Sequence, residues 1–401
     1  MTDPSVAEVS LRRDGFGPAP DATALRERAG LVRVPTPFGP PAWLLTRHAD
    51  VRAMLGDADA FANGWTPEDI GGARDPRQLS GDRRGNLLAL DPPDHTRLRR
   101  MLTPEFTVRR MRRLEPRIVE IVDGHLDALE RHGTPADLVA RFALPVPSLV
   151  ICELLGVPAA DQDEFQQRTA RQLDTTLPEP ERVALAAEAL AYMRDLVARA
   201  RRDPGEDLIG MLIREHCSDD REEMSDAELV GVANLLLVAG HETTSNMLAL
   251  GTLALLRHPD QLALVRDDPQ AVPGAVEELL RWLSIVNSGS PRLALRDVEV
   301  DGITIRRGDL VSFQLPAANR DPAVTDGAER LDVARRATNH VAFGHGIHHC
   351  LGAPLARMEM RVAFGALVRR FPNLRLAVAD DEVEWATHRA IHGLVRLPVT
   401  W

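Results

Sequence analysis

The sequence predicts a mainly α-helical fold with a small β region. Apolar residues recur at helical spacing almost throughout residues 94–270. Alternating and β-branched apolar patterns are confined to residues 31–49, residues 293–313 and the end of the chain. No internal repeat, low-complexity tract or linker divides the 401 residues, so we expect a single domain over residues 1–401.

The expected β segments are marked by turn residues. Residues 31–49 surround a Pro/Gly turn, residues 293–313 alternate around an Asp–Gly pair as in a hairpin, and the tail GLVRLPVTW is strand-like. After the first β segment, residues 62–90 are Gly-rich, polar and aperiodic. A loop of this length in a compact domain is typical of a functional or mobile segment.

The longest expected helix begins at Ser225, where SDAE forms a capping box with Glu228, and ends at His258–Pro259. Its roughly thirty residues would extend about 45 Å, enough to cross a domain. The sequence GHETTSN at 240–246 interrupts its apolar pattern. Either a polar surface face passes here, or the helix lines a cavity in which an acid and an alcohol deliver protons.

Composition excludes several classes of function. All 48 basic residues are arginine, which rules out a lysine Schiff base and a lysine-containing phosphate loop. No GxGxxG opens a helix, and a net charge of −11 disfavours nucleic acid as a partner. The apolar runs are too short to span a bilayer, and no signal peptide is evident. Three distant cysteines suit a reducing compartment, so we expect a cytoplasmic protein with no membrane contact.

Two charged segments each have two interpretations. In DPPDHTRLRR at 91–100, His95 and Arg99 face the same way on a helix, as a pair able to bind a carboxylate or phosphate. Residues 97–117 carry eight arginines against two glutamates, which indicates either docking of an acidic partner or a solvated helix face. Glu278 and Arg281 can form an ion pair of the kind common on helix surfaces.

FGHGIHHCLGAPLAR at 343–357 combines three histidines with a cysteine. Zinc is disfavoured, because adjacent ligands on one short turn cannot all converge on one ion. A nucleophilic Cys350 lacks an evident orienting group. The order suits a single thiolate ligand instead: Gly344 and Gly346 allow a tight turn, and the helix that follows can stabilise the thiolate. Gly352 leaves room for a flat cofactor, and haem iron held by a cysteine thiolate has this chemistry.

These residues resemble motifs of a known family. FGHGIHHCLG is similar to the haem-binding signature of the cytochromes P450, Phe-x-x-Gly-x-x-x-Cys-x-Gly, at Phe343, Gly346, Cys350 and Gly352. AGHETT at 239–244 resembles the family's oxygen-activating helix motif, and EELLR at 277–281 resembles its Glu-x-x-Arg. Further segments, DPPDHTRLRR, ICELLGVP and LPVTW, extend the resemblance, in particular to soluble actinobacterial members, over essentially the whole chain.

The resemblance implies the cytochrome P450 fold, with haem b between the long central helix and the helix after the cysteine loop. Cys350 would be the proximal ligand of the iron, with Phe343, Gly344 and Gly352 beside it. The haem propionates would be met by four basic side chains, namely His95, Arg99, Arg292 and His348. His345 and His349 would remain loop residues, and Cys152 and Cys217 thiols without a role.

The resemblance also assigns two further groups. Glu242 and Thr243 would relay protons during dioxygen activation, next to Ala239 and to Gly240, which would leave space for oxygen. Glu278 and Arg281 would be a buried structural pair, joined by Arg335 or Arg330.

The implied activity is that of a monooxygenase, which inserts one oxygen atom from O2 into an unactivated C–H bond of a small organic molecule. Electrons would come from a ferredoxin and its reductase, docked on residues 97–117, and the protein would act as a monomer. The alternatives are epoxidation, dehydrogenation or oxidative coupling by the same oxidant, a non-catalytic haem-thiolate sensor, and a thiol enzyme.

The resemblance places the substrate between several segments of the chain. The expected walls are the loop 62–90, residues 236–242 beginning with Leu236, the segment after the Glu-x-x-Arg helix, and the last loop. The segment after that helix contributes Val286, Asn287 and Ser288, and the last loop contributes Arg389, Ala390, Ile391 and His392. Their polar groups favour a functionalised secondary metabolite, such as a polyketide macrolide, over a bare terpene.

Overall fold

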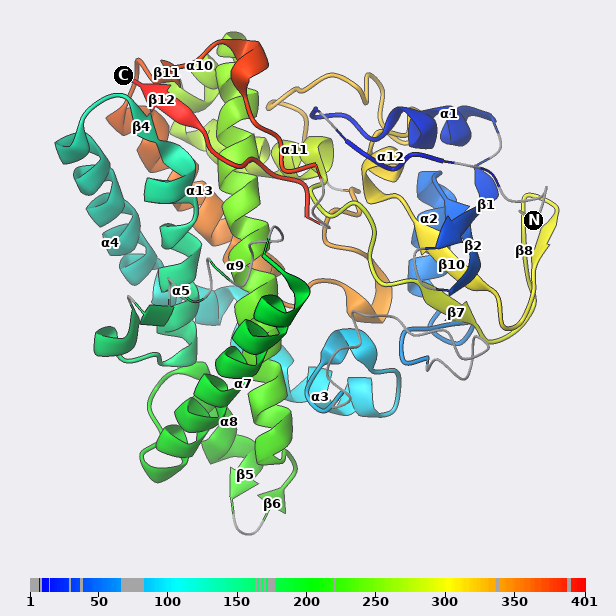
Figure 1. Ribbon diagram of the computed structural model, residues 1–401. Helices are drawn as coiled ribbons and strands as arrows, with labels where there is room; N and C mark the ends of the chain where they lie inside the picture. The colour runs from blue at the N-terminus through cyan, green and yellow to red at the C-terminus, as the bar shows by residue number, and fades with distance from the viewer. Residues whose placement is uncertain are drawn as a thin grey trace.

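The longest helix, α9 (Asp226–Leu256), runs through the middle of the helical part of the molecule (Figure 1). It begins with the predicted capping box: the Ser225 hydroxyl accepts a hydrogen bond from the backbone N–H of Glu228, and the Glu228 carboxylate accepts one from the backbone N–H of Ser225. Residues 244–255 are all buried, so the second half of α9 is a core helix.

The structure is a computed structural model of the chain. It describes residues 7, 9–13, 15–28, 30–36, 39–65, 83–162, 164, 165, 168, 171, 177–218, 221–336, 339–387 and 391–401.

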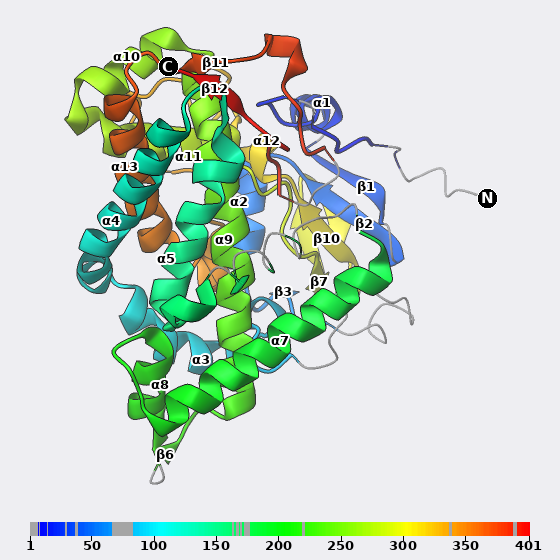
Figure 2. The same ribbon diagram turned by 60° about the vertical axis from the view of Figure 1, so that its left-hand side comes forward.

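Other helices pack around α9 and against one another. They include α3 (Asp94–Leu102), α4 (Val108–His132), α5 (Pro145–Leu155), α7 (Glu179–Arg202), α8 (Leu208–His216), α10 (Pro259–Asp267), α11 (Val272–Leu283) and α13 (Ala353–Arg370). Helix α4 packs against α13, while α5, α7 and α13 all contact α9, with α7 crossing it in Figure 2. The short helices α1 (Pro20–Arg28), α2 (His48–Gly56) and α12 (Leu315–Asn319) lie with the strands (Figure 1).

The main sheet lies on the opposite side of α9 from α4 and α5 (Figure 1). Its strand order is β1-β2-β10-β7-β3, formed by β1 (Leu31–Thr36), β2 (Gly39–Leu45), β10 (Leu310–Phe313), β7 (Arg292–Ala294) and β3 (Phe61–Ala62). The predicted hairpin forms between β8 (Val298–Val300) and β9 (Ile303–Ile305). Both residues of its turn, Asp301 and Gly302, have positive φ (51° and 74°), as a two-residue hairpin turn requires.

Small strands complete the fold. The tail forms β12 (Pro398–Thr400), which pairs with β11 (Arg375–Leu376) and with β4 (Ala136–Asp137). A hairpin of β5 (Cys217–Ser218) and β6 (Arg221–Glu222) interrupts the segment 94–270, for which the sequence predicted helix. Strands of two residues are too short to leave an alternating pattern, so the sequence does not mark them. Among the described residues, no helix is long and apolar enough to cross a membrane.

Candidate functional site

The cysteine loop is a tight turn that precedes α13. The backbone N–H of Cys350 donates to the carbonyl oxygen of Phe343 at 2.9 Å, which closes the loop. Gly344 and Gly346 both have φ of +72°, a conformation that favours glycine. A Cβ on Gly346 would also collide with the carbonyl oxygen of Leu55, so the loop needs glycine there to pack against the end of α2.

The thiol of Cys350 is accessible but closely surrounded by protein. The residue is exposed, yet burial raises the pKa of its thiol, which places the sulfur on a concave surface. The backbone N–H groups of Gly352 and Ala353, at the start of α13, and the cations Arg99 and Arg357 act in the opposite direction and favour the thiolate. A Cβ on Gly352 would meet nothing within 4 Å, so open space adjoins the cysteine.

The polar turn of α9 faces open space. Ala239 is exposed and Glu242 and Thr243 are half-buried, although the helix is buried from residue 244 onwards. The Thr243 hydroxyl donates to the carbonyl oxygen of Ala239 at 2.7 Å, and the Asn246 side-chain amide donates to the carbonyl oxygen of Glu242 at 2.9 Å. These bonds stay within an unbroken helix. The acid and the alcohol are therefore presented side by side in mid-helix, inside the molecule.

The structure gives Gly240 a role in packing against α5. A Cβ on Gly240 would lie 2.5 Å from Cδ1 of Ile151, so the missing side chain lets α9 approach α5. The side of Gly240 that lacks a side chain thus faces a packed helix, and the expectation that Gly240 leaves space for oxygen stays a prediction. The next residue, His241, is buried with Nε2 3.1 Å from the Leu144 carbonyl oxygen. Burial lowers the pKa of His241 to about 4, so the ring is neutral.

Three of the four expected anion-binding residues form a buried basic cluster. The rings of His95 and His348 lie 4.3 Å apart, and Arg292 is buried beside them. Both ring nitrogens of each histidine, and Nε of Arg292, lack a hydrogen-bond partner among the described residues. The Asp91 carboxylate lies 4.0 Å from His348 Nε2, too far for a hydrogen bond. Burial, as the largest cause, lowers the pKa of His95 to about 4 and that of Arg292 to about 10.

Unpaired buried donors are costly, so this basic cluster fits an anionic group that is a hydrogen-bond acceptor. The fourth expected residue, Arg99, lies close by, but its Nη2 donates to the carbonyl oxygen of His349 at 2.7 Å. Arg99 therefore also holds the backbone of the cysteine loop. Of the loop histidines, His349 is exposed and His345 is half-buried.

The ring of Phe343, in the cysteine loop, contacts the guanidinium of Arg357, which is itself paired with Glu277. The Arg357 guanidinium lies 4.6 Å from the centre of the Phe343 ring, and it donates to the Glu277 carboxylate at 2.7 and 2.9 Å. His340 Nε2 also lies 3.2 Å from this carboxylate. Burial opposes its charge, but the hydrogen bonds from His340 and Arg357 lower the pKa of Glu277 to about 2.

The Glu278–Arg281 pair is buried and has a third member. Arg281 donates to both carboxylate oxygens of Glu278 at 2.7 and 2.8 Å, and the Glu278 side chain is completely inaccessible. Arg335 Nε donates to the same carboxylate at 3.2 Å. Of the two alternatives, the structure thus joins Arg335; the guanidinium of Arg330 lies 3.8 Å from Asp332 instead.

The expected pocket walls are only partly brought together. Val286 pairs with Ile391 in an isolated antiparallel bridge, and Leu236 and Ser288 are half-buried. Asn287 accepts a hydrogen bond from Arg13 at 3.0 Å. Residues 66–82 and 388–390, which include Arg389 and Ala390, lie outside the described residues.

His392 is buried, with Nε2 2.8 Å from the carbonyl oxygen of Gly15. His392 and Asn287 thus both bond to the N-terminal segment, and whether they also make the pocket polar stays a prediction.

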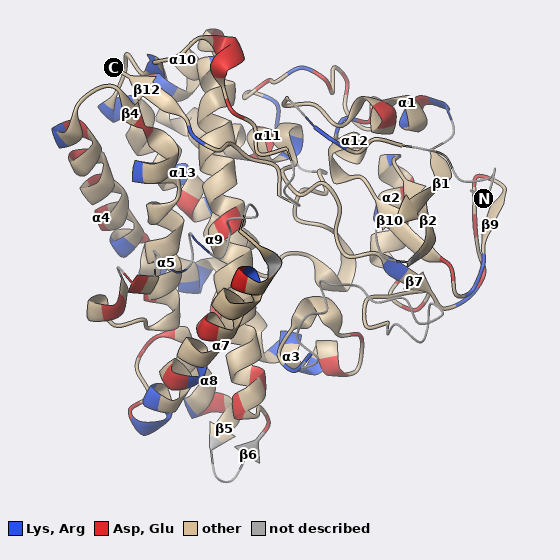
Figure 3. Ribbon diagram, viewed as in Figure 1, with Lys and Arg blue, Asp and Glu red and all other residues tan. Residues whose placement is uncertain are grey.

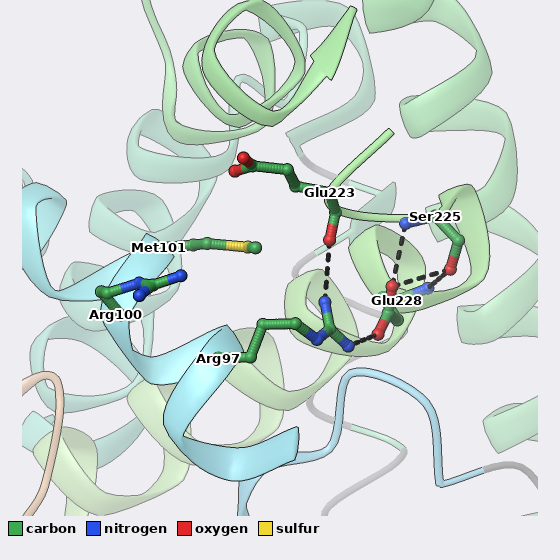
Figure 4. A pocket seen from close by; sticks show the side chains of 6 residues that line it. All are labelled: Arg97, Arg100, Met101, Glu223, Ser225 and Glu228. Atoms are coloured by element: carbon green, nitrogen blue, oxygen red, sulfur yellow. Dashed lines mark hydrogen bonds and ion pairs between the residues drawn. The ribbon is translucent and has the colours of Figure 1, made fainter. Parts of the chain in front are cut away.

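The arginine-rich segment is not one continuous basic face. Arg110 pairs with Glu105 at 3.0 Å, and Arg117 pairs with Glu120 and Glu153 at 2.9 Å each. Both signs of charge occur along α4 (Figure 3). Another arginine, Arg97, contacts the Glu228 carboxylate and a backbone carbonyl, and with Arg100 it lines a pocket of about 460 Å³ that acidic side chains share (Figure 4). This pocket contains none of the cysteine-loop residues.

The buried charged residues that the sequence analysis did not single out include Glu359 and Arg13. Glu359, on α13, is buried with Oε2 unpartnered among the described residues, and burial raises the pKa of its carboxyl group well above the usual value. Its signal was a charged residue within the apolar helix pattern RMEMRVAF. Arg13 had no signal, because it lies in an N-terminal stretch without periodicity.

Three features together are those of the haem-thiolate oxygenases: an accessible cysteine at a helix start, a buried basic cluster, and an acid–alcohol turn on the core helix. The chain belongs to the cytochrome P450 family. The family model described as cytochrome P450 matches residues 181–389. The predicted family, fold and monooxygenase class are thereby confirmed.

Known proteins similar to the chain include "Cytochrome P450 FAS1" of Rhodococcoides fascians, 46% identical over 98% of both chains. "Mycinamicin IV hydroxylase/epoxidase" of Micromonospora griseorubida is 42% identical over 94% of both. The crystal structure of the LnmA cytochrome P450 hydroxylase, from the leinamycin pathway of Streptomyces atroolivaceus, matches with a TM-score of 0.90 and 43% identity over 99% of this chain and 100% of that one. The family implies a haem-thiolate cofactor, dioxygen, a redox partner and a small-molecule substrate.

Proposed function

We propose that this cytochrome P450 monooxygenase hydroxylates an unactivated C–H bond of a secondary metabolite, such as a polyketide macrolide, in natural-product biosynthesis. The observation that carries the catalytic part is the Glu242–Thr243 turn, which faces open space in the middle of a core helix. The substrate class is supported by relatives whose names give mycinamicin and leinamycin chemistry. The name of the first also includes epoxidase, so epoxidation is the second candidate.

The residues present fit haem b as the cofactor. Cys350 supplies the thiolate ligand, and the unpartnered donors of His95, His348 and Arg292 match the two propionate carboxylates, with Arg99 close by. The chain has only three cysteines and none near Cys350, which disfavours covalent attachment of the haem. When bound, the thiolate-ligated haem supplies the activation of dioxygen.

We assign proton delivery to the turn of α9. A hydroxyl has one donor and two acceptor positions, and the Thr243 proton is directed to the carbonyl oxygen of Ala239. The Thr243 oxygen can thus accept a hydrogen bond from a neighbouring proton donor. When the hydroxyl rotates away from Ala239, it can pass its own proton towards the reacting site while it takes up the proton of that donor. Glu242, the adjacent acid, replenishes that proton from solvent.

We assign electron supply to a ferredoxin and its reductase. Arg100, Arg109 and Arg112, on α3 and α4, are exposed, and the described part of the chain offers them no ion-pair partner. Helix α3 also touches the cysteine loop through Arg99. An acidic protein docked on these arginines would thus be close to the thiolate ligand.

We further propose a cytoplasmic monomer with one domain. All three cysteines are free, as in a reducing compartment. The exposed large apolar side chains include Leu88, Leu264 and Val395, which lie on separate elements rather than in one patch.

The thiolate assignment is tested by the spectrum of the reduced, carbon-monoxide-bound protein. The haem-loaded wild type should show the red-shifted band of thiolate ligation, and Cys350→His should lose it. Cys152→Ser and Cys217→Ser are matched controls that should keep the band, because both thiols are buried elsewhere. Persistence of the band in Cys350→His would overturn the assignment. A screen of macrolides for substrate-induced spin-state shifts then tests the substrate class.

A further inference from the structure

An N-terminal arginine, Arg13, is buried against the segment that follows α11. Its guanidinium donates to the carbonyl oxygens of Leu283 at 2.7 Å and Ser284 at 2.9 Å, and to the side-chain oxygen of Asn287 at 3.0 Å. It also donates to the carbonyl oxygens of Phe16 and Gly17, which fold its own segment around it. Residues about 270 apart in the sequence are thus joined by one side chain.

The segment held by Arg13 has an irregular backbone that belongs to no helix or strand. Ser284, directly after α11, has φ of 39°, a left-handed conformation that is strained for a residue other than glycine. Apart from Arg13, the segment is held on one side by Asn319, which donates to the Ser284 hydroxyl at 2.7 Å, and by the backbone N–H of Leu315, which donates to the carbonyl oxygen of Asn287 at 3.3 Å. On the other side it is held by the last loop of the chain, through the bridge between Val286 and Ile391 and through the backbone N–H of His392, which donates to the carbonyl oxygen of Ile285 at 2.8 Å. A turn that contains such a strained residue keeps its backbone conformation only while contacts with the surrounding residues stabilise it.

The last loop is tied to the same N-terminal segment and to α9. The His392 ring lies 2.8 Å from the Gly15 carbonyl oxygen. The following residue, Gly393, lies so close to α9 that a Cβ there would collide with the Asn246 side chain. Asn246 in turn donates to the carbonyl oxygen of Glu242. A continuous set of contacts therefore connects residues 13–17 with the acid–alcohol turn.

We infer that Arg13 is a positioning residue that sets substrate selectivity, by fixing residues 284–288 and, through them, Ile391 in the wall that faces α9. This inference rests on the proposed function and on the expectation from the sequence that Val286, Ser288 and Ile391 line the substrate pocket. Arg13 touches neither substrate nor cofactor; it acts through the backbone of the wall.

The chemistry of the contact makes arginine specific here. All five acceptors are neutral oxygens spread around the planar guanidinium. Burial, together with the nearby Arg320, lowers the pKa of Arg13 to about 9. A lysine has one nitrogen and three donors, and it cannot reach five oxygens arranged around a plane. Arg13→Lys thus preserves the positive charge but removes the planar arrangement of five hydrogen-bond donors.

A matched control is available on the same N-terminal part of the chain. Arg26, on α1, is also buried and donates to the carbonyl oxygen of Ala317 at 2.9 Å. None of its recorded bonds involves residues 284–288 or 391–393. Arg26→Lys therefore measures the general effect of weakening a buried arginine near the N-terminus.

The experiment compares haem-loaded wild type, Arg13→Lys, Arg13→Ala and Arg26→Lys by titration with two iron-binding azoles. Imidazole is small and tests the iron alone, whereas clotrimazole is bulky and must contact the wall. We expect the Kd of clotrimazole to change at least about fivefold in Arg13→Lys, because small displacements of positioned groups have large effects. Its Kd for imidazole, and both constants of Arg26→Lys, should stay at the wild-type values. Backbone amides 285–288 should exchange hydrogen faster in Arg13→Lys, with or without haem, but not in Arg26→Lys.

An unchanged clotrimazole Kd in Arg13→Lys overturns the inference, and so does an equal change in Arg26→Lys, which would show general loosening. If Arg13→Ala does not accumulate as folded protein, Arg13→Lys alone decides. Failure of the proposed function has a different signature, namely a wild type without the thiolate band in its carbon-monoxide spectrum.

Discussion

Thr243 donates its hydroxyl proton to the carbonyl oxygen of Ala239, one helical turn earlier, at 2.7 Å. The same type of bond joins Thr252 to the carbonyl oxygen of Leu248 at 2.8 Å, two and a half turns further along α9. The two threonines differ in their surroundings, because Thr252 is buried in the core while Thr243 adjoins the exposed Ala239. Thr252 is therefore a suitable control, on the same helix, for substitutions of Thr243.

Thr243→Ala should uncouple electron use from product formation. Loss of the hydroxyl removes a proton donor beside the reacting site, and such groups contribute about a hundredfold or more. Nicotinamide oxidation by the reconstituted system should continue while product per electron falls, with peroxide as the by-product. Thr252→Ala should leave the coupling ratio unchanged. Equal coupling in Thr243→Ala and wild type would exclude the assigned role.

His95→Ala should weaken haem retention. The His95 ring contributes buried donors that lack a partner among the described residues, and one hydrogen bond to a charged group contributes about 1.5–3 kcal/mol. Transfer of haem to apomyoglobin should therefore be faster by about tenfold or more, at 1.4 kcal/mol per factor of ten. His349→Ala is the control, since His349 is an exposed residue of the cysteine loop outside the basic cluster. Equal transfer rates in the two variants would contradict the propionate assignment.

The sequence predicts the fold class and the tight turn before Cys350 well, because both depend on local patterns. The capping box at Ser225 and the Asp301–Gly302 turn are decided by neighbouring residues, and they form as expected. Two glycines and a helix start around Cys350 likewise favour the turn, although Arg99 and the end of α2 also hold the loop in place.

Features that depend on distant contacts could not be predicted in this way. Whether Asn287 and His392 face a substrate depends on Arg13 and Gly15, which pair with them across more than 250 residues. The role of Gly240 depends on the approach of Ile151 from α5. Propensity and periodicity carry no information on such pairs, so they cannot show which polar residues near a site already have partners elsewhere in the chain.

Glu278→Gln should destabilise the folded protein strongly. It leaves Arg281 and Arg335 buried beside a neutral amide, and breaking a buried pair costs about 3–5 kcal/mol. Urea denaturation of the haem-loaded protein should show this loss as a lower midpoint. Arg330→Gln is the control, because its guanidinium is exposed and lies 3.8 Å from Asp332. A midpoint for Glu278→Gln equal to that of Arg330→Gln would mean that the buried pair contributes no stability.

The titration of Glu277 should lower the free energy of unfolding at acidic pH. Its folded-state pKa, about 2, lies below the usual value of 4.5. The stabilisation is therefore fully present above about pH 4.5 and is lost as the pH falls towards 2. In Glu277→Gln the unfolding free energy should be lower at neutral pH and should depend less on pH within this window. Parallel pH profiles for the variant and wild type would show that Glu277 is not the titrating group.

Electron transfer from an acidic ferredoxin should weaken with salt and with loss of the unpaired arginines. Screening shortens the range of charge attraction to about 10 Å at 0.1 M ionic strength, so the KM for ferredoxin should rise as salt is added. Arg109→Gln and Arg112→Gln should raise this KM at low salt and flatten its salt dependence, while kcat at saturating ferredoxin stays nearly constant. Arg117→Gln is the control on the same helix, because Arg117 already pairs with Glu120 and Glu153. If all three variants gave the same KM and salt dependence as wild type, the docking face would have to lie away from α4.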